Sequence, residues 1–222
     1  MTAWINRLLE LIYPPLPAIE EPTLMSLRSC PVCHEVYERG AATLSVCPNC
    51  LNRNWSLDQA RAPYRADGVV RDHILAFKYN QAFYYLPRLV DWIEKGYQLY
   101  YAGIEPPFDA LVPVPLHPRK QRERGFNQAD EIALFLARRI RLPRMACLRR
   151  IHESPTQTRL TRAQRLKNPQ GAFEVKSRFD IKKKRLLLLD DVFTTGATAD
   201  ACARALKKAG AAYVAVLTIA RG

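Results

Sequence analysis

The chain of 222 residues is 48% hydrophobic and 25% charged, and 34 Lys and Arg against 21 Asp and Glu give it a formal net charge of +13. It is long enough for one full hydrophobic core with a small additional unit, and the absence of any run of about 18 uncharged apolar residues excludes a membrane-spanning helix. The segment 119–185 holds 20 Lys and Arg against 6 Asp and Glu, so a phosphate-rich partner is expected.

The first predicted element is a short amphipathic helix near the N-terminus. In MTAWINRLLELIYPPLP the apolar side chains recur at helical spacing until Pro14 and Pro15 end the pattern. Glu10 lies within the apolar part, and no basic leader or small-residue cleavage site accompanies it, so the segment does not resemble a signal peptide. We expect a cytoplasmic protein whose residues 1–29 form this helix and a linker. The helix either packs on the rest of the protein or docks on a partner.

Two cysteine pairs follow, CPVC with Cys30 and Cys33 and CPNC with Cys47 and Cys50. Each pair brings two thiolates to one side of a tight turn, and two such turns close a tetrahedral four-sulfur shell around Zn²⁺. A closed shell has no open coordination position, so we expect a structural zinc in a ribbon over residues 30–58. The alternative is two disulfides, which would require an oxidising compartment.

Three further residues could be read as metal ligands. His34 follows Cys33 directly, and we expect it to be a solvated neighbour of the site rather than a ligand. Cys147 and Cys202 stand singly among apolar residues and are expected to be buried.

From residue 59 onward, helical and strand patterns alternate. Apolar residues at helical spacing predict helices, and short apolar runs predict buried strands. The predicted elements are helices over 67–79 and 82–101, a strand over 108–116, a helix over 127–140, a strand over 185–191, a helix over 198–210 and a strand over 213–220. Strands separated by helices indicate an α/β fold with a doubly wound parallel sheet over residues 59–222.

The helix over 127–140 has the clearest pattern. Asn127 is expected to be its N-cap, since a side-chain oxygen there accepts from an unpaired N–H of the first turn. The inward positions are expected to be Ile132, Phe135, Leu136 and Ile140.

The stretch RLLLLDDVFTTGATAD, residues 185–200, predicts a ligand site. Its leucines form a strand buried on both faces, and VFTTGAT is expected to be the turn into the next helix, where ligands bind in α/β sheets. Gly196 lets the backbone approach a ligand, and Thr194, Thr195 and Thr198 offer amides and hydroxyls at a helix N-terminus. This loop fits a monophosphate. The alternative is a turn with no ligand.

Two adjacent acids, Asp190 and Asp191, stand at the mouth of this loop. Carboxylates do not bind phosphate, but they accept from vicinal hydroxyls and hold Mg²⁺ through its waters. Together with the loop they describe a site for a ribose 5-phosphate with a metal ion. The chain has no GxxxxGK[ST] and no GxGxxG after a strand, so neither a P-loop NTPase nor a dinucleotide fold is supported.

These residues resemble a known family. LLLLDDVFTTGATA is similar to the phosphoribosyl pyrophosphate motif of type I phosphoribosyltransferases. The stretches VPVPLHPRKQRERGFNQADEIA (112–133) and TQTRLTRAQRLKNPQGAF (156–173), with the double CxxC ribbon ahead of them, narrow the resemblance to the ComF competence family. The resemblance implies that the sheet domain is of the type I phosphoribosyltransferase kind.

The resemblance also implies a set of site residues. The ribose hydroxyls would be bound by the acids and the 5-phosphate by the loop after them, with Mg²⁺ accompanying the ligand; this segment comprises Asp190, Asp191, Val192, Phe193, Thr194, Thr195, Gly196, Ala197 and Thr198. The pyrophosphate would be flanked by His117, Arg119, Lys120, Arg124, Asn127 and Gln128. A mobile loop would contribute Arg159, Thr161, Gln164, Arg165 and Asn168, unless that stretch is a solvated basic helix.

For function, the resemblance implies DNA uptake in natural transformation, with single-stranded DNA and a ComF-type helicase as partners. Phe126, Tyr79, Tyr84 and Tyr85 could stack on bases, or they could be core residues. The alternative is an active phosphoribosyltransferase acting on a base or an amine, although no base-reading hood is recognisable, so the sequence leaves catalysis open. A third possibility is a transcription regulator that senses phosphoribosyl pyrophosphate. It is not supported, because no helix-turn-helix segment is recognisable in the sequence.

Overall fold

The computed structural model describes residues 21–25, 29–36, 46–105, 107–151 and 171–222. The predicted N-terminal helix and the five candidate residues between 159 and 168 lie outside the described residues. The central sheet is parallel, with the order β1-β7-β6-β3 and β2 also paired to β7. Its strands are β1 (Gln59–Arg61), β2 (Tyr64–Arg65), β3 (Ala110–Pro113), β6 (Arg185–Phe193) and β7 (Tyr213–Arg221). A separate antiparallel pair joins β4 (Leu148–Arg150) to β5 (Phe173–Val175).

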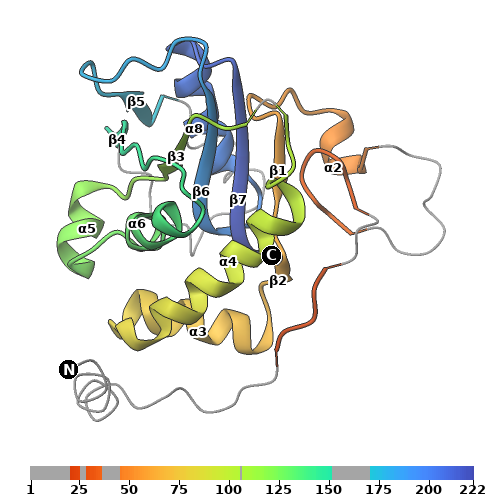
Figure 1. Ribbon diagram of the computed structural model, residues 1–222, viewed down its shortest axis with the longest axis vertical. Coiled ribbons are helices and arrows are strands. Elements are labelled where there is room, and N and C mark those ends of the chain that lie inside the picture. The colour runs from red at the N-terminus through yellow and green to blue at the C-terminus, as the bar shows by residue number, and fades with distance from the viewer. Residues whose placement is uncertain (1–20, 26–28, 37–45, 106, 152–170) are drawn as a thin grey trace.

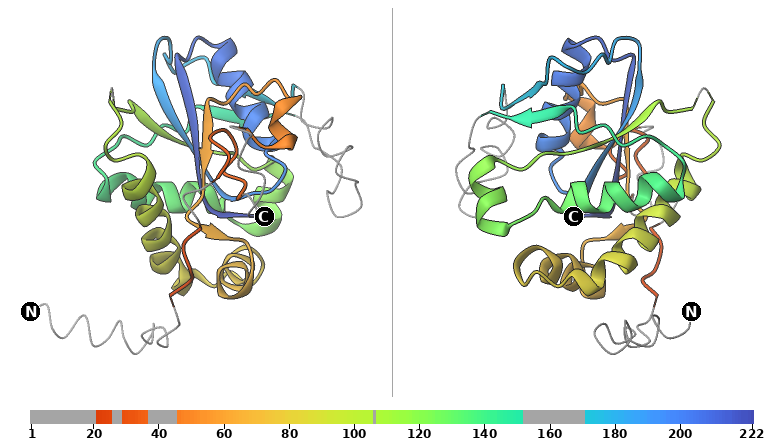
Figure 2. Two further views of the ribbon diagram at one scale, coloured as in Figure 1. Left: turned by 90° about the vertical axis from the view of Figure 1, so that its right-hand side faces the viewer. Right: turned by 60° about the vertical axis from the view of Figure 1, so that its left-hand side comes forward.

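Helices cover both faces of this sheet. They are α2 (Pro48–Leu51), α3 (Gly68–Tyr79), the 3₁₀ turn η1 (Phe83–Tyr85), α4 (Leu86–Tyr100), α5 (Pro118–Arg124), α6 (Gln128–Arg139) and α8 (Ala197–Lys208). Figure 1 shows α4 and α6 in front of the strands and α8 behind them. The left view of Figure 2 separates the layers, with α4 on one side of the sheet and both α8 and α2 on the other.

The four leucines of β6 explain why the sheet is covered twice. Leu187 and Leu189 belong to the core cluster formed with α3, α4 and α6, whereas Leu186 and Leu188 belong to the cluster formed with α8 and the four cysteines. All four side chains are fully buried, and each contributes about 1.5–3 kcal/mol by leaving water. The predicted α/β architecture with a doubly wound parallel sheet is confirmed.

Several predicted boundaries need correction. The sequence predicts Val192 and Phe193 in the turn after the strand. In the structure both residues pair with β7, so β6 extends to Phe193. The helix expected over 82–101 begins at Leu86 and is preceded by η1, since Pro87 is tolerated only in the first turn of a helix. Phe135 was expected to point inward and is 42% exposed.

The sequence did not predict β1, β2, β4, β5 or α5. The four strands are two or three residues long, too short for a periodic signal. Their partners are also distant: β1 and β2 pair with β7, far along the chain. No helix in the described part of the chain is long and apolar enough to cross a membrane.

Candidate ligand-binding cavity and metal centre

A cavity of about 250 Å³ opens at the carboxyl ends of β3 and β6. The predicted loop forms one wall, and the end of β3 with α5 forms another. Its lining comprises Lys78, Val114, Pro115, Leu116, Lys120, Arg124, Gln128, Arg150, Thr218 and all residues from Asp190 to Ala199. The structure therefore brings the whole predicted 190–198 segment together with three of the six residues predicted to flank the pyrophosphate.

The loop between β6 and α8 turns at Gly196. Its φ is 70°, in the left-handed region that favours glycine, and an added Cβ would overlap the Phe193 ring and lie 2.7 Å from Cη2 of Trp55. Helix α8 then begins at Ala197, and the Asp200 N–H donates to the Gly196 carbonyl at 2.8 Å. The positive end of the helix dipole thus lies at the cavity wall, an arrangement that favours an anion.

The two acids have different environments. Asp191 is 5% exposed and forms an ion pair with Lys78 of α3, whereas Asp190 is only half-buried and accepts from the Asp191 N–H at 2.9 Å. Burial alone would raise the pKa of Asp191, but the Lys78 ammonium lowers it below its usual value. Burial and the neighbouring Asp191 charge raise the pKa of Asp190 well above its usual value. Asp190 is therefore the acid more accessible to a ligand.

Sequence reasoning missed Lys78. Burial alone would lower its pKa, but Asp191 raises it above its usual value, so the side chain stays charged. A signal was present: Lys78 follows Ile74 by one helical turn on the buried stripe of α3, where a charged residue needs a partner. Arg150 and Thr218, which come from β4 and β7, carried no comparable signal.

The remaining residues predicted to flank the pyrophosphate do not line the cavity. His117 caps α5, with its Nδ1 accepting from the Arg119 N–H at 3.3 Å, and Arg119 pairs with Glu123 at 3.0 Å. Asn127 is the predicted N-cap of α6: its Oδ1 accepts from the Ala129 N–H at 3.2 Å. Its Nδ2 also donates to the Val114 carbonyl at 3.0 Å, which fixes the chain at the cavity edge.

The four cysteines converge as predicted. Their sulfur atoms all lie within 4.8 Å of one another, and all four side chains are buried. Zn–S bonds of about 2.3 Å in a tetrahedron place sulfurs about 3.8 Å apart, so the group fits Zn²⁺. Burial alone would raise the pKa of the Cys30 thiol, but N–H groups of Cys47, Cys33 and Val32 lower it to about 7, whereas burial raises the pKa of Cys33 to about 11 and also raises that of Cys50. All six cysteines are described and none forms a disulfide. Cys147 and Cys202 are buried, as expected.

The expectation for His34 was wrong. Its side chain is 2% exposed, with Nδ1 accepting from the Ala62 N–H at 3.2 Å and the ring 4.9 Å from that of Tyr100. Burial, followed by the charge of Arg61, lowers its pKa to about 4. His34 is thus a neutral core residue that ties the first cysteine turn to the chain after β1.

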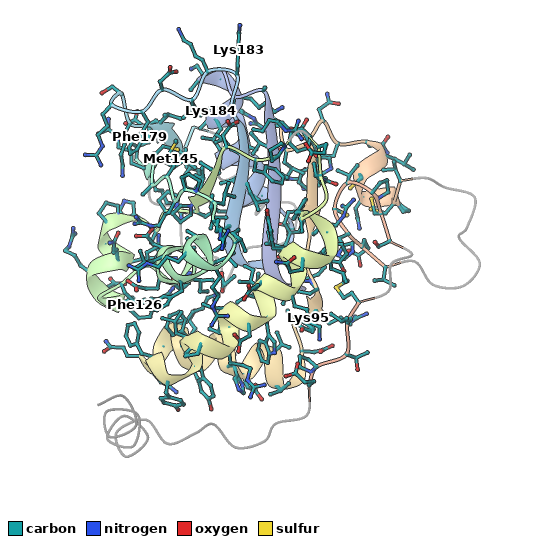
Figure 3. All side chains as sticks on the ribbon, viewed as in Figure 1. Lys95, Phe126, Met145, Phe179, Lys183 and Lys184 are labelled. Atoms are coloured by element: carbon teal, nitrogen blue, oxygen red, sulfur yellow. The ribbon has the colours of Figure 1, made fainter. Side chains whose placement is uncertain are left out.

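The four aromatic residues considered for base stacking divide into two groups. Phe126 is buried, with its ring 5.0 Å from Phe77, and lies between α5 and α6 on the side facing α3 (Figure 3). Tyr85 packs 4.0 Å from the His73 ring. Tyr79 and Tyr84 are 70% and 46% exposed, although the Arg124 guanidinium lies 5.3 Å from the centroid of the Tyr79 ring and the Tyr84 ring packs 4.4 Å from that of Tyr85.

The basic side chains of the described part of segment 119–185 include two groups at opposite ends of β6. Lys120, Arg124 and Arg150 line the cavity. Lys182, Lys183 and Lys184 precede β6 and therefore lie at the opposite end of the strand, where Lys183 projects from the body of the protein (Figure 3).

Comparison with known proteins gives three informative relatives. The chain is 34% identical to competence protein F of Haemophilus influenzae over 51% of this chain and 50% of that one. It is 27% identical to competence protein ComFC of Bacillus subtilis over 86% and 77%, and 32% identical to DNA utilization protein YhgH of Escherichia coli K12 over 54% and 52%. The chain thus matches about half the length of the first and third relatives. No protein-family model matches it.

Two solved structures overlap the fold at low similarity. One is a glutamine phosphoribosylpyrophosphate amidotransferase from B. subtilis, with a TM-score of 0.38 and 18% identity over 59% of this chain and 25% of that one. The other, described as the allosteric regulatory enzyme of purine biosynthesis, gives the same TM-score and identity over 60% and 25%. The named relatives confirm the resemblance that the motifs indicated.

Proposed function

Because this chain is a homologue of competence proteins F and ComFC and of DNA utilization protein YhgH, we propose that it handles single-stranded DNA during DNA uptake or utilisation. We further propose that the cavity at the end of β6 binds phosphoribosyl pyrophosphate with Mg²⁺. A ComF-type helicase as partner and a cytoplasmic location belong to the same proposal; the location is supported by the thiols, which a reducing compartment preserves.

One observation supports the ligand assignment above the others. The loop Thr194–Thr198, the half-buried Asp190 and the basic side chains of Lys120, Arg124 and Arg150 all line one cavity. A helix N-terminus suits the 5-phosphate, a carboxylate accepts from ribose hydroxyls, and basic side chains suit a pyrophosphate.

The residues present also fit the two metal ions. The four cysteines would hold zinc as a structural ion, and Asp190 would hold Mg²⁺ through water ligands. Bound with the ligand, Mg²⁺ would offset the negative charge of the pyrophosphate. The Lys78–Asp191 pair keeps the carboxylate beside Asp190 charged and fixed in the absence of ligand.

A second candidate function is phosphoribosyl transfer to a base or an amine. The same lining supports it, because that reaction depends mainly on positioning and on electrostatic stabilisation of a cation-like transition state. Pyrophosphate release measured with Mg²⁺ and a panel of bases and amines distinguishes an enzyme from a binding protein. Release with any acceptor would make transfer the primary function.

The first prediction concerns the acids. Replacing both Asp190 and Asp191 by Asn keeps their shape and removes their charge, so the affinity for phosphoribosyl pyrophosphate with Mg²⁺ should fall about ten-fold or more, as measured by calorimetry. Asp91→Asn is the control. It removes an exposed carboxylate of α4 that pairs with Arg139 of α6, and this variant should bind normally. Unchanged affinity in the double variant would show that the cavity does not use the acids.

The second prediction concerns DNA. If the basic segment binds a single strand through its phosphates, the logarithm of the affinity should fall with the logarithm of salt concentration by about 0.7 per phosphate neutralised. Ala at Arg159, Arg162 and Arg165 should each make that slope shallower by about one contact, whatever the base sequence. Fluorescence anisotropy of labelled oligonucleotides over a salt series measures it.

Two results bear on the ranking of the functions. Zinc content should be unchanged in these Arg variants, because the cysteines are distant in sequence and form their own cluster. Weak DNA binding that the three substitutions hardly alter, together with pyrophosphate release, would favour the transferase instead.

A further inference from the structure

The segment that carries the cysteines contacts the proposed anion-binding loop, Thr194–Thr198, on the side away from the ligand cavity. A second cavity, of about 60 Å³, lies on that side and is lined by Cys33, Asn49, Arg53, Trp55, Arg221 and the loop residues Phe193, Thr194 and Thr195. The loop is therefore a wall between the ligand cavity and a small space next to the metal centre.

Two arginines bind the backbone of the loop from this second cavity. Arg53 Nη1 donates to the Thr195 carbonyl at 2.7 Å. Arg221 Nη1 donates to the carbonyls of Thr194 and Phe193 at 2.7 and 3.1 Å. Three successive carbonyls of the loop are thus turned toward guanidinium groups.

This orientation fixes the amides as well. In a trans peptide the C=O of one residue and the N–H of the next point in opposite directions. With the carbonyls of Phe193, Thr194 and Thr195 turned toward the arginines, the N–H groups of Thr194, Thr195 and Gly196 are turned away from them. Successive N–H groups on one side of a turn form an anion-binding concavity. The arginines therefore present these N–H groups to the side where the ligand cavity lies.

Both arginines are tied to the metal centre. Arg53 lies three residues after Cys50, and its N–H donates to the Cys50 carbonyl at 3.3 Å. Its guanidinium lies 3.5 Å from the centroid of the Trp55 ring, which in turn packs on Phe193. Arg221 Nε donates to the Cys33 carbonyl at 3.2 Å.

A third contact joins the same segment to α8. The Ser56 N–H donates to Asp200 Oδ1 at 2.6 Å, and Asp200 lies in the first turn of the helix whose N-terminus faces the ligand cavity. The cysteine segment thus contacts the loop, the glycine turn and the start of the helix.

We propose that Arg53 and Arg221 are positioning residues for the anion-binding loop, and that through them the four-cysteine metal centre is coupled to ligand binding. Metal loading orders the loop and strengthens binding of the phosphate. By reciprocity, bound ligand raises the affinity for the metal by the same factor. This coupling rests on the proposed function, because it assumes that the loop binds the phosphate of the ligand.

The test compares Arg53, in the cysteine segment, with Arg61, the last residue of β1. Arg53→Ala removes the contact to the loop. Arg61→Ala is the matched control, because Arg61 is also half-buried and donates at 2.8 Å to a carbonyl of the first cysteine turn, that of Pro31, but does not line either cavity. Both proteins are used zinc-loaded, with metal content checked by elemental analysis.

Two ligand measurements are expected to separate these variants. In calorimetry, Arg53→Ala should bind phosphoribosyl pyrophosphate with Mg²⁺ about ten-fold more weakly than wild type, and Arg61→Ala should bind normally. In equilibrium competition with a chromophoric chelator, saturating ligand should raise the zinc affinity several-fold in wild type and Arg61→Ala but hardly at all in Arg53→Ala. Equal ligand affinity and an equal rise in zinc affinity in both variants would overturn the proposal.

A third measurement uses no ligand. Hydrogen exchange of the peptide covering residues 193–199 should be faster in Arg53→Ala than in Arg61→Ala. Faster exchange in a protein that does not bind phosphoribosyl pyrophosphate would reject the proposed ligand but support the mechanical link. Normal binding with unchanged exchange in Arg53→Ala would reject the link and leave the proposed function intact.

Discussion

Replacing Cys50 by Ala should lower the zinc content from about one ion per chain to near zero and destabilise the fold severely. A structural four-thiolate site contributes about 10–16 kcal/mol of apparent binding energy to folding. The lost sulfur by itself would cost only about 1 kcal/mol, as a methyl-sized cavity does. Elemental analysis and urea unfolding measure the two effects.

Cys202→Ala is the matched control for this substitution. Cys202 is as buried as the cluster cysteines and loses the same atom, but it lies in α8 away from the other sulfurs. It should keep its zinc and lose only about 1 kcal/mol of stability. A fully folded, zinc-free wild-type protein would contradict the assignment of the metal centre.

Replacing Lys78 by Met should reduce the free energy of unfolding at pH 7 by about 3–5 kcal/mol, because it leaves the buried Asp191 carboxylate without its cation. In this variant burial raises the pKa of Asp191 above its unfolded value. The deficit is therefore full at pH values above that raised pKa and shrinks as the pH falls and the carboxyl takes up a proton. Urea unfolding at pH 7 and pH 5 measures it.

Two further variants identify the cause of that loss. Adding Asp191→Asn to Lys78→Met removes the unpaired charge, so the double variant should be more stable than Lys78→Met alone. Lys95→Met changes an exposed lysine of α4, labelled in Figure 3, and should have little effect on stability. A double variant that is as unstable as the sum of its two single variants would show that the ion pair is not the cause.

The loop between β6 and α8 was predictable because its signal is local. Four apolar residues, two acids and a threonine-rich turn around Gly196 occupy one stretch, and the strand, turn and helix that they form are consecutive. The cysteine pairs were predictable for the same reason. The spacing within each pair is enough to place two sulfurs on one side of a turn.

The parts that the sequence did not give are contacts between distant segments. Lys78 reaches Asp191 from α3, which is far from β6 in the sequence, and His34 is buried because the chain after β1 covers it. Arg53 had no local feature that distinguishes it from the other arginines of a basic chain. The fold alone decides which of the 34 Lys and Arg face the loop.

The support of the loop has a consequence for the order in which the molecule assembles. The Arg53–Thr195 contact spans 142 residues of chain, and the Arg221–Cys33 contact spans 188. During synthesis the N-terminal part emerges first, and contacts of high sequence separation form late. The four sulfurs can close as soon as residue 50 has emerged, whereas the loop between β6 and α8 gains its Arg221 contacts only with β7. A nascent chain halted before β7 should therefore carry metal while this loop is still incompletely supported.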